Sequence, residues 1–318
     1  MTVRKIIIDT DPGIDDAMAI FLALASPELD VVGLTTVMGN VEVELATTNA
    51  LRLLEIANRS DIPVAEGSAK PIAADFLGAV EFVHGDDGQG NAFLPAPTTQ
   101  PLGISAAEFI VQQSRANPGE ITLVPIGPLT NIALALRLEP NLPKLIAGVV
   151  LMGGNAFCPG NASPTAEANI RNDPEAADVV FGAGWPITMV GLDVTNEVLM
   201  TDDDLDELHS FATPQGQHLG RINPFYRAFL GERLGAAGIV IHDSTAIAYL
   251  LAPDLFKVMR APVRVETGGS FSRGKTWPYV GRTDDHHLPA WQSRPLVDIC
   301  AAVNAPAVVT LILDRLRP

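Results

Sequence analysis

Six short runs of apolar, mostly β-branched residues constrain the fold of this 318-residue chain more than any other feature. Within the runs, apolar residues follow one another instead of alternating with polar ones, which is typical of strands buried on both faces. Segments with helical spacing separate the runs, and this alternating order builds a parallel sheet covered by helices. The predicted strands are residues 4–8, 30–37, 121–126, 147–154, 186–194 and 238–242.

The segments between these runs are predicted to be helices, and the chain reads as one unit. The helices are expected at residues 15–25, 42–58, 104–116, 129–138, 174–183, 203–212 and 222–234. No internal repeat, low-complexity tract or linker divides the sequence, so residues 1–318 are predicted to form a single α/β domain with a mostly parallel, doubly wound (Rossmann-like) sheet. Residues 68–103 are rich in Gly, Pro and Asp and are expected to form a long loop over the functional site.

Composition and charge exclude several kinds of partner. The formal net charge is −16, and a field of that sign repels nucleic acid and anionic membrane surfaces. No apolar run approaches the roughly 20 residues of a membrane span. The two cysteines, Cys158 and Cys300, lie outside any CxxC pair, which is typical of a reduced, cytoplasmic protein without a zinc-thiolate site. The expected partner is therefore a small molecule.

The segment "DTDPGIDDA" (residues 9–17) places four aspartates around a Pro-Gly turn, directly after the first predicted strand. In a parallel sheet this position lies at the carboxyl end of a strand, where ligands bind. Burying like charges so close together without a partner costs on the order of several kcal/mol each. A helix start stabilises acids in its first turn, which accounts for one or two of these aspartates but not for all four. A hard divalent cation, calcium or magnesium, would resolve the repulsion.

The remaining ligands of such a cation must come from other strand ends, because the spacing of this segment excludes an EF-hand loop. That loop needs glycine at its sixth position and an acid at its twelfth, where this chain has Ile14 and Ile20. The segment "IHDSTA" (241–246) ends a predicted strand with His242 and Asp243. A histidine and a carboxylate side by side at a strand end are candidates for a catalytic site.

Further polar stretches are candidates for the same site. "VPIGPLTNIALAL" (124–136) ends a strand in a turn rich in Pro and Gly, where a backbone carbonyl can point outward. Residues 152–155 and 160–176 offer amides and Glu167 in polar loops. His84 in "VHGDDGQG" is a candidate substrate ligand in a loop, whereas the adjacent His286 and His287 are expected to face solvent.

Six segments resemble, in their order along the chain, motifs of the inosine-uridine preferring nucleoside hydrolases. They are "IIIDTDPGIDDAMAI", "VMGN", "PIGPLTNIALAL", "LMGGN", "AEANIRNDPEAA" and "IHDSTAIAYL", and they extend from the N-terminus to about residue 250. The resemblance implies a nucleoside N-ribohydrolase with one calcium ion at the bottom of its pocket. The implied ligands of the ion are the side chains of Asp11, Asp16 and Asp243 and the backbone carbonyl of Ile126.

The same resemblance implies how the sugar is held. Asp15 would bind a ribose hydroxyl, Met152 would pack beneath the ribose, and Asp9 would support its neighbours without a ligand role. Further contacts with the sugar would come from Asn40, Asn161, Glu167 and Asn169. Members of the family are usually dimers or tetramers, so a homodimer or a homotetramer is expected.

The chemistry of N-glycosidic hydrolysis suggests roles for the remaining residues. The reaction needs a poised water, a stabilised oxocarbenium-like sugar and a departing base. Asp11 would accept a proton from a water whose pKa the ion lowers, and His242 would assist the leaving base. The base would lie near residues 221–235, where Phe225, Tyr226, Phe229 and Arg233 are candidates to line it. No phosphate-cradling glycine loop occurs, so nucleosides are favoured over nucleotides.

Two other interpretations of the sequence remain open at this point. A HAD-type phosphatase would use Asp9 as nucleophile and Asp11 as acid-base, with magnesium, because a DxD pair after an apolar strand is typical of that family. A non-catalytic nucleoside- or ribose-binding protein would keep the diol ligands but would not need His242. Turnover separates the three, because the products are free base with ribose, inorganic phosphate, or none.

Overall fold

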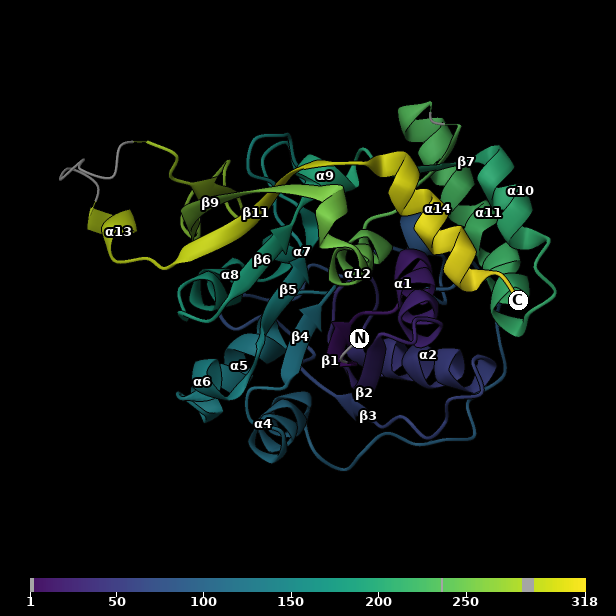
Figure 1. The fold of residues 1–318 in the computed structure, drawn as a ribbon, viewed down its shortest axis with the longest axis horizontal. Coiled ribbons are helices and arrows are strands. Elements are labelled where there is room, and N and C mark those ends of the chain that lie inside the picture. Colours follow the sequence, from purple (N-terminus) through teal and green to yellow (C-terminus); the bar gives the residue numbers. More distant parts are fainter. Residues whose placement is uncertain (1–2, 236, 282–288) are drawn as a thin grey trace.

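A computed structural model describes residues 3–235, 237–281 and 289–318 of the chain. Across these residues the central element is a nine-stranded sheet with helices on both faces (Figure 1). In spatial order its strands are β10 (Thr276–Pro278), β9 (Phe256–Val265), β11 (Leu296–Val303), β6 (Ile187–Val190), β5 (Gly148–Met152), β4 (Ile121–Pro125), β1 (Arg4–Thr10), β2 (Leu29–Thr36) and β3 (Val64–Glu66). All pairs from β11 to β3 are parallel, whereas β9 and β10 at one edge pair antiparallel. The predicted α/β fold with a mostly parallel sheet is therefore confirmed.

The strand predicted at residues 238–242 lies outside this sheet. β8 (Gly238–Val240) pairs antiparallel with β7 (Leu199–Thr201) in a separate two-stranded sheet, so the prediction that this run joins the parallel sheet is wrong. β11 takes the place beside β6, and β9 and β10 extend the edge. The sequence pattern does not reveal β9 and β11, because charged residues interrupt their apolar runs. Arg260 and Asp298, for example, form an ion pair across the two strands.

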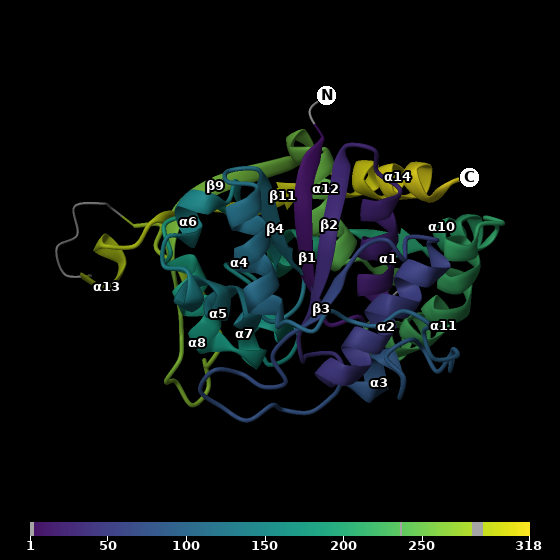
Figure 2. The ribbon, with the colours of Figure 1, turned by 90° about the horizontal axis from the view of Figure 1, so that it is seen from below.

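Helices cover the two faces of the sheet, as Figure 2 shows. The helices that pack into the core on one face are α1 (Ile14–Leu24), α2 (Val43–Ile56), α10 (Asp202–His209), α11 (Pro214–Leu234), α12 (Asp243–Leu251) and α14 (Ala305–Leu316). The helices of the opposite core are α4 (Ala106–Ala116), α5 (Thr130–Leu138), α6 (Leu142–Leu145) and α8 (Pro174–Phe181). The short elements are α3 (Glu81–His84), α7 (Ala168–Asn172), α9 (Leu192–Thr195), α13 (Pro289–Gln292) and the 3-10 turn η1 (Pro253–Leu255).

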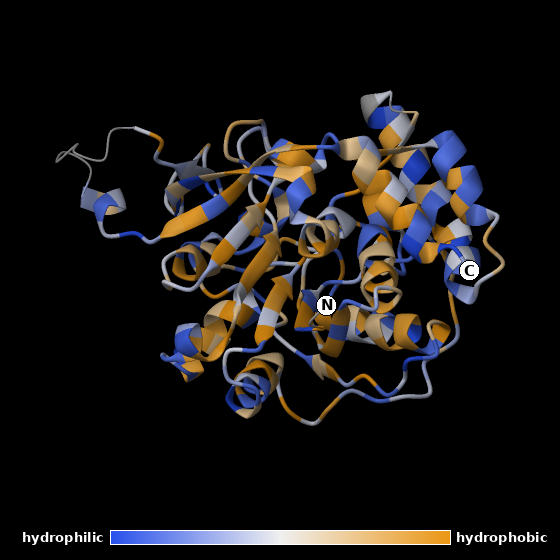
Figure 3. Ribbon diagram, in the orientation of Figure 1, coloured by the Kyte–Doolittle hydropathy of each residue, from blue (hydrophilic) through white to orange (hydrophobic). Residues whose placement is uncertain are grey.

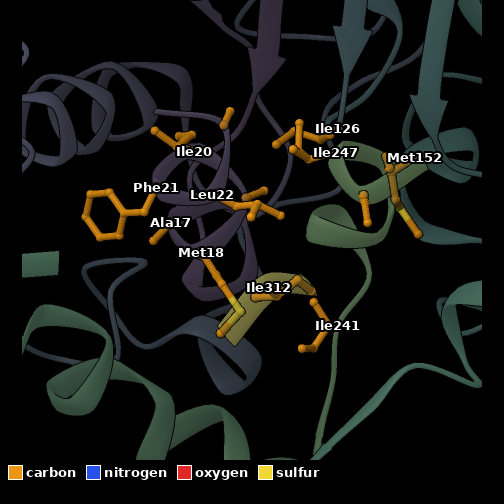
Figure 4. Close-up of a cluster of buried hydrophobic side chains, with 14 of the residues drawn as sticks. Ala17, Met18, Ile20, Phe21, Leu22, Ile126, Met152, Ile241, Ile247 and Ile312 are labelled. Carbon is orange, nitrogen blue, oxygen red and sulfur yellow. The ribbon is translucent and has the colours of Figure 1, made fainter. Parts of the chain in front are cut away.

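The first strand explains why its sequence is apolar throughout. Side chains alternate between the faces of a strand, so Ile6 and Ile8 pack into the core beside α1, whereas Ile7 packs into the opposite core. Met18 and Phe21 of α1 belong to the first of these cores (Figure 4). In Figure 3 the strands of the central sheet are mostly hydrophobic, while several helices carry hydrophilic residues. Burial on both faces is thus the structural origin of the pattern that predicts the sheet.

The predicted helices are present, with boundaries that shift by a few residues. The largest difference is at residues 222–234, because α11 begins at Pro214 and continues through Pro224. Residues 68–103 form a long loop whose only helix is α3. No helix in the described part of the chain is both long and apolar enough to cross a membrane. His286 and His287 lie outside the described residues, so their predicted exposure is untested.

Candidate active site

A cavity of about 490 Å³ lies beyond the carboxyl ends of the parallel strands. Its lining includes residues that follow β1, β2 and β4 and the last residue of β5, together with parts of α3, α11 and α12. The residues predicted to bind substrate all line it, namely Asp15, Asn40, His84, Met152, Asn161, Glu167 and Asn169. Ile126, His242 and Asp243 line it as well. Residues far apart in sequence therefore meet where open α/β sheets bind their ligands.

The turn between β1 and α1 is closed by Asp16. Gly13 is the N-cap of α1, and Asp15 and Asp16 lie in its first turn, where the helix dipole favours negative charge. Oδ2 of Asp16 accepts a hydrogen bond from the Gly13 backbone N–H (2.9 Å), and Oδ1 accepts one from the Thr10 hydroxyl (2.5 Å). These bonds point the Asp16 carboxylate back across the turn, so local geometry alone accounts for one of the four acids.

The Asp11 carboxylate is packed into a space that two glycines leave open. A Cβ at Gly39 would lie 1.9 Å from Oδ2 of Asp11, and a Cβ at Gly127 would lie 2.6 Å from Oδ1. Oδ2 accepts a hydrogen bond from the Asn40 backbone N–H (2.7 Å), while the Asn40 side chain donates to Oδ2 of Asp16 (3.0 Å). Oδ1 of Asp11 is buried and has no hydrogen-bond partner among the described residues. One oxygen is thus anchored and the other is available.

Asp9 of β1 is buried and is not part of the described lining of the cavity. Its Oδ1 accepts hydrogen bonds from the Thr35 hydroxyl (2.6 Å) and from Nδ2 of Asn131 (2.8 Å). Burial raises the pKa of Asp9 to about 7, against the opposing effect of these two donors. Asp9 is absent from the described lining of the cavity, as are Asp11 and Asp16. The supporting role expected for Asp9 stays a prediction.

Three carboxylates converge beside the cavity. Oxygens of Asp15, Asp16 and Asp243 all lie within 4.8 Å of one another. Burial, then repulsion from Asp16, raises the pKa of Asp15 to about 7, and burial with the neighbouring acids raises that of Asp243 well above its usual range. Burial and the Asp16 charge likewise raise the pKa of Asp11. The predicted set of metal-binding side chains had Asp11 where this convergent group has Asp15, and Asp11 is linked to the group by charge repulsion from Asp16 and Asp15.

The Ile126 carbonyl, predicted to be a ligand, lies at this site and is already held by an amide. Nδ2 of Asn169 donates hydrogen bonds to the carbonyl oxygens of Ile126 (2.7 Å) and Met152 (3.1 Å). A carbonyl oxygen has two lone pairs, so the Ile126 oxygen keeps one for a further partner. Asn169 thereby ties the end of β5 to the residue that follows β4, and its own position is fixed by both.

Glu167 and Asn161 belong to the loop that follows β5, and their carboxylate and amide groups shape it. Glu167 is the N-cap of α7, and its oxygens accept hydrogen bonds from the backbone N–H groups of Asn169 (2.8 Å), Ile170 (3.0 Å) and Gly154 (2.9 Å). The Asn161 side-chain oxygen accepts one from the N–H of Ala168 (3.0 Å). Both side chains reach the cavity from a loop that is extensively hydrogen-bonded within itself.

His242 is the N-cap of α12 and directly precedes Asp243. Its Nδ1 is 2.8 Å from the Thr195 hydroxyl, and the ring lines the cavity. Burial lowers the pKa of His242 to about 4, so the imidazole is neutral at pH 7. Thr195 comes from α9, directly after β6, and the sequence interpretation did not identify it. A polar residue at a strand end was the signal that could have found it.

An aromatic wall formed by His84, Tyr226 and Phe229 covers one side of the cavity. The rings of His84 and Tyr226 stack with centroids 6.1 Å apart, and those of Tyr226 and Phe229 stack at 6.5 Å. Arg233 lies over the Phe229 ring at 5.6 Å, so three of the four residues predicted near the base are present. Phe225 packs against the hydrophobic core and is not part of the described lining, so its predicted place is not supported.

His84 is fixed to the β1 turn as well as to this wall. It is the last residue of the short helix α3 rather than part of an irregular loop, and its Nδ1 accepts a hydrogen bond from the Ile14 N–H (3.1 Å). Burial, with a smaller effect of His242, lowers the pKa of His84 to about 3. Phe82, which was not predicted, packs edge-on against Phe229 and extends the wall from the same helix.

Comparison with known proteins assigns the chain that carries these features to a family. The sequence profile of the inosine-uridine preferring nucleoside hydrolases matches residues 6–310. A probable uridine nucleosidase 2 from Arabidopsis thaliana is 48% identical over 98% of this chain and 97% of its own length. A solved plant nucleoside hydrolase, PpNRh1, superposes with a TM-score of 0.96 at 39% identity over 98% of both chains. A purine-preferring ribonucleoside hydrolase from Gardnerella vaginalis superposes with a TM-score of 0.91 at 32% identity, again over 98% of both chains.

The matches cover nearly the whole chain, including the strands and helices that carry the convergent acids and His242. They separate the interpretations left open by the sequence, because the relatives are hydrolases of N-glycosyl bonds rather than phosphatases or non-catalytic binding proteins. This chain belongs to the inosine-uridine preferring nucleoside hydrolase family and is an enzyme that hydrolyses ribonucleosides.

Proposed function

We propose that this enzyme is a calcium-dependent hydrolase of uridine and related ribonucleosides, which it cleaves to free base and ribose. The observation that carries the proposal is the convergence of Asp15, Asp16 and Asp243 beside a cavity that His242 also lines. The preference for uridine is inferred from a relative, 48% identical, that is described as a uridine nucleosidase. Residues 1–318 would act as one catalytic domain.

The donor set fits a calcium ion. Side chains of Asp11, Asp16 and Asp243 and the carbonyl of Ile126 would hold the ion, with Asp15 beside it. All of these donors are oxygens, which suit hard cations and not zinc or copper. Oδ1 of Asp11 and Oδ1 of Asp15 have no hydrogen-bond partner among the described residues and are buried among like charges. This environment favours a bound cation. When bound, calcium would supply positive charge and the Lewis acidity that lowers the pKa of a water molecule.

Asp11 is proposed to accept the proton of the attacking water. Its Oδ2 is held by the Asn40 N–H, while its Oδ1 has no partner among the described residues and is free to accept a proton. The packing of Gly39 and Gly127 against the carboxylate keeps it from turning away. A general base held in this way is effective because its geometry is set before the substrate arrives.

His242 is proposed to assist the leaving base from the opposite side. If the Thr195 hydroxyl donates to Nδ1, the ring proton resides on Nε2, which would then be the donor toward the cavity. The stacked wall of Tyr226 and Phe229 would hold the base beside this donor. Proton transfer or hydrogen bonding to the departing base lowers the barrier most when the base is a poor leaving group.

The sugar is proposed to lie between the β1 turn and the loop after β5. Oδ1 of Asp15 has no hydrogen-bond partner in the described part of the chain and would accept a hydrogen bond from a ribose hydroxyl. Met152 would pack beneath the ring, and the remaining sugar contacts would come from Asn40, Asn161, Glu167 and Asn169. Such a site leaves buried charges unpaired when a hydroxyl is absent, and it therefore discriminates strongly against deoxy sugars.

The state of the enzyme in the cell is part of the same proposal. We expect a reduced, cytoplasmic homodimer or homotetramer. Burial raises the pKa of the Cys158 thiol to about 11 and that of Cys300 to about 12, so both remain protonated and poorly reactive at neutral pH. Sedimentation of the reduced protein measures the assembly, and a monomer would contradict this part.

The test of the proposed function compares uridine with 2′-deoxyuridine, with and without calcium. We expect uridine to be cleaved at least about a thousandfold more efficiently, since sites built for a hydroxyl reject its absence by about 10⁴. Chelation should abolish release of reducing sugar, and added calcium should restore it. Elemental analysis of protein purified without chelator should find calcium. Equal rates on the two sugars, or full activity in a metal-free sample, would overturn the proposal.

A further inference from the structure

The segment 272–276, "SRGKT", packs directly against the loop that follows β5. Gly274 has a positive φ of 86°, and a Cβ there would lie 2.8 Å from the Cα of Arg171 and 3.1 Å from the Cβ of Ala166. Only glycine combines this conformation with so close an approach. The segment belongs to none of the sheet-end motifs used above, yet it contacts the loop that carries Asn161 and Glu167.

Lys275 is buried in this contact and points its charge at the loop backbone. Its Nζ donates hydrogen bonds to the carbonyl oxygens of Asn155 (2.6 Å) and Ala156 (3.2 Å). The side chain is 8% exposed, so the ammonium has exchanged most of its water for these carbonyls. Lysine is rarely buried to this extent without a specific partner.

Asp193 of α9 binds the same stretch of backbone through its N–H groups. Its carboxylate accepts hydrogen bonds from the N–H groups of Ala156 (2.6 Å), Phe157 (2.7 Å) and Cys158 (3.2 Å). The Lys275 ammonium therefore binds carbonyl oxygens of this stretch, and the Asp193 carboxylate binds its N–H groups. Charge-assisted hydrogen bonds are stronger than neutral ones, and here they act on a loop without regular secondary structure.

Thr276 and Asn155 make further hydrogen bonds that fix the same loop. The Thr276 hydroxyl donates to the Asn155 carbonyl (2.7 Å) and accepts from the Asn155 N–H (2.9 Å). The Asn155 side chain donates to the carbonyls of Cys158 (2.9 Å) and Thr165 (3.1 Å). The two ends of the loop are thereby joined on either side of residues 159–162, which line the cavity.

We propose that Lys275 and Asp193 are positioning residues that hold loop 155–162 in its substrate-binding conformation. The proposal depends on the assignment of this loop to the ribose under Proposed function. Neither residue lines the cavity in the described structure, so both act through the backbone that places Asn161. If the loop is already ordered before substrate binds, binding loses less conformational entropy and is tighter. The effect of losing this order should therefore appear mainly in KM.

The test replaces Lys275 by methionine, which keeps the length of the side chain and removes its charge. Lys275→Met should raise KM for uridine about tenfold or more, because small misplacements of binding groups cost factors of up to about 10². The kcat should stay within about threefold of wild type, since Asp11 and His242 lie outside the loop. Lys275→Arg keeps the charge and should restore part of the loss. Lys257→Met, on the exposed side of β9, is the matched control and should behave as wild type.

Hydrogen exchange gives a second readout that is independent of activity. The N–H groups of residues 156–158 should exchange faster in Lys275→Met, while those of β1 keep their protection. If Lys275→Met fails to fold, Asp193→Asn carries the same expectations, because it removes the charge and keeps one carbonyl acceptor.

The outcomes separate this proposal from the one on which it depends. An unchanged KM, or a loss confined to kcat, in a folded Lys275→Met or Asp193→Asn variant would overturn the positioning role and leave the proposed function intact. A wild-type enzyme that cleaves uridine and 2′-deoxyuridine equally would instead overturn the proposed ribose site.

Discussion

Two helices of this protein begin with runs of aspartate, and the two runs have opposite environments. α1 carries Asp15 and Asp16 in its first turn, and α10 carries Asp202, Asp203 and Asp204. Both helix starts offer the same favourable dipole. In α10 the first two acids are exposed, whereas in α1 Asp15 lines a cavity and both carboxylates lie near two further buried aspartates.

The charges of the two runs are balanced in different ways. Asp202 pairs with Arg227 at 2.5 Å, and that hydrogen bond holds its pKa below the usual range. Among the described residues the acids of α1 have no cationic side chain as a hydrogen-bond partner, and burial raises the pKa of Asp15 to about 7. Water and an arginine balance the negative charge of the α10 acids, so these acids do not indicate a binding site. The buried cluster lacks any such balance, which is why it points to a bound cation.

The largest expected difference between the runs is in turnover. Asp11→Asn should lower kcat on uridine by about 10³-fold or more, since it removes a proposed metal ligand and a general base that alone contributes about 10²–10⁴. The matched change in the exposed run, Asp203→Asn, should leave kcat within about twofold. Steady-state ribose release measures both. Similar kcat values for the two variants would remove the distinction between the clusters.

His242 tests whether the buried cluster works together with a donor to the leaving base. His242→Ala should lower kcat on uridine by about 10²-fold or more, the lower range for a general acid. It should spare a p-nitrophenyl riboside, whose anion leaves without protonation. Kinetics on both substrates measure the ratio, and equal losses on the two would exclude the leaving-group role.

The pH dependence of stability distinguishes the clusters in calcium-free protein. The pKa of Asp15 is raised to about 7, so the folded state keeps a proton that the unfolded state loses near pH 4. Stability from this group is therefore present at low pH and is lost as pH rises toward 7. Asp15→Asn removes that loss and should stabilise the calcium-free protein by an amount that grows from pH 5 to pH 7 and then levels off.

The buried histidines have lowered pKa values, so their contribution to stability changes with pH in the opposite direction. Because wild type and variant both contain them, this contribution drops out when the two free energies of unfolding are subtracted. Urea unfolding in chelator measures the free energies. Asp203→Asn, in the exposed run, should show no such growth with pH. A gain for Asp15→Asn that is the same at pH 5 and pH 7 would contradict the buried, repelling environment.

The smallest effect is expected for the ion pair of α10. Arg227→Ala removes the partner of Asp202, and exposed ion pairs contribute little to stability because water screens them. The melting temperature should fall by a few degrees at most, and less at high salt, while kcat stays unchanged. A large loss of activity would show that the Asp202–Arg227 pair influences the site, contrary to the comparison.

Much of the fold could be predicted from sequence because its determinants are local. Ile6, Ile7 and Ile8 are apolar on both faces, and this alone indicates a strand covered by two layers. The edge formed by β9 and β10 could not be predicted, because half-exposed strands tolerate charges such as Arg260. β8 has the composition of a core strand, and only its tertiary partner, β7, decides that it leaves the main sheet.

The sequence by itself determined the family, the acidic turn and the His242–Asp243 pair, because each is a short, ordered motif. It did not decide which acids meet, since Asp15 and Asp243 are brought together by the packing of α1 against α12. Asn131 lies within a quoted motif but was given no role, and Thr195 and Lys275 lie outside the motifs. Each makes a hydrogen bond to a distant part of the chain beside the site. Burial separates the acids of α1 from those of α10, and burial is a property of the assembled layers that no local run of aspartates contains.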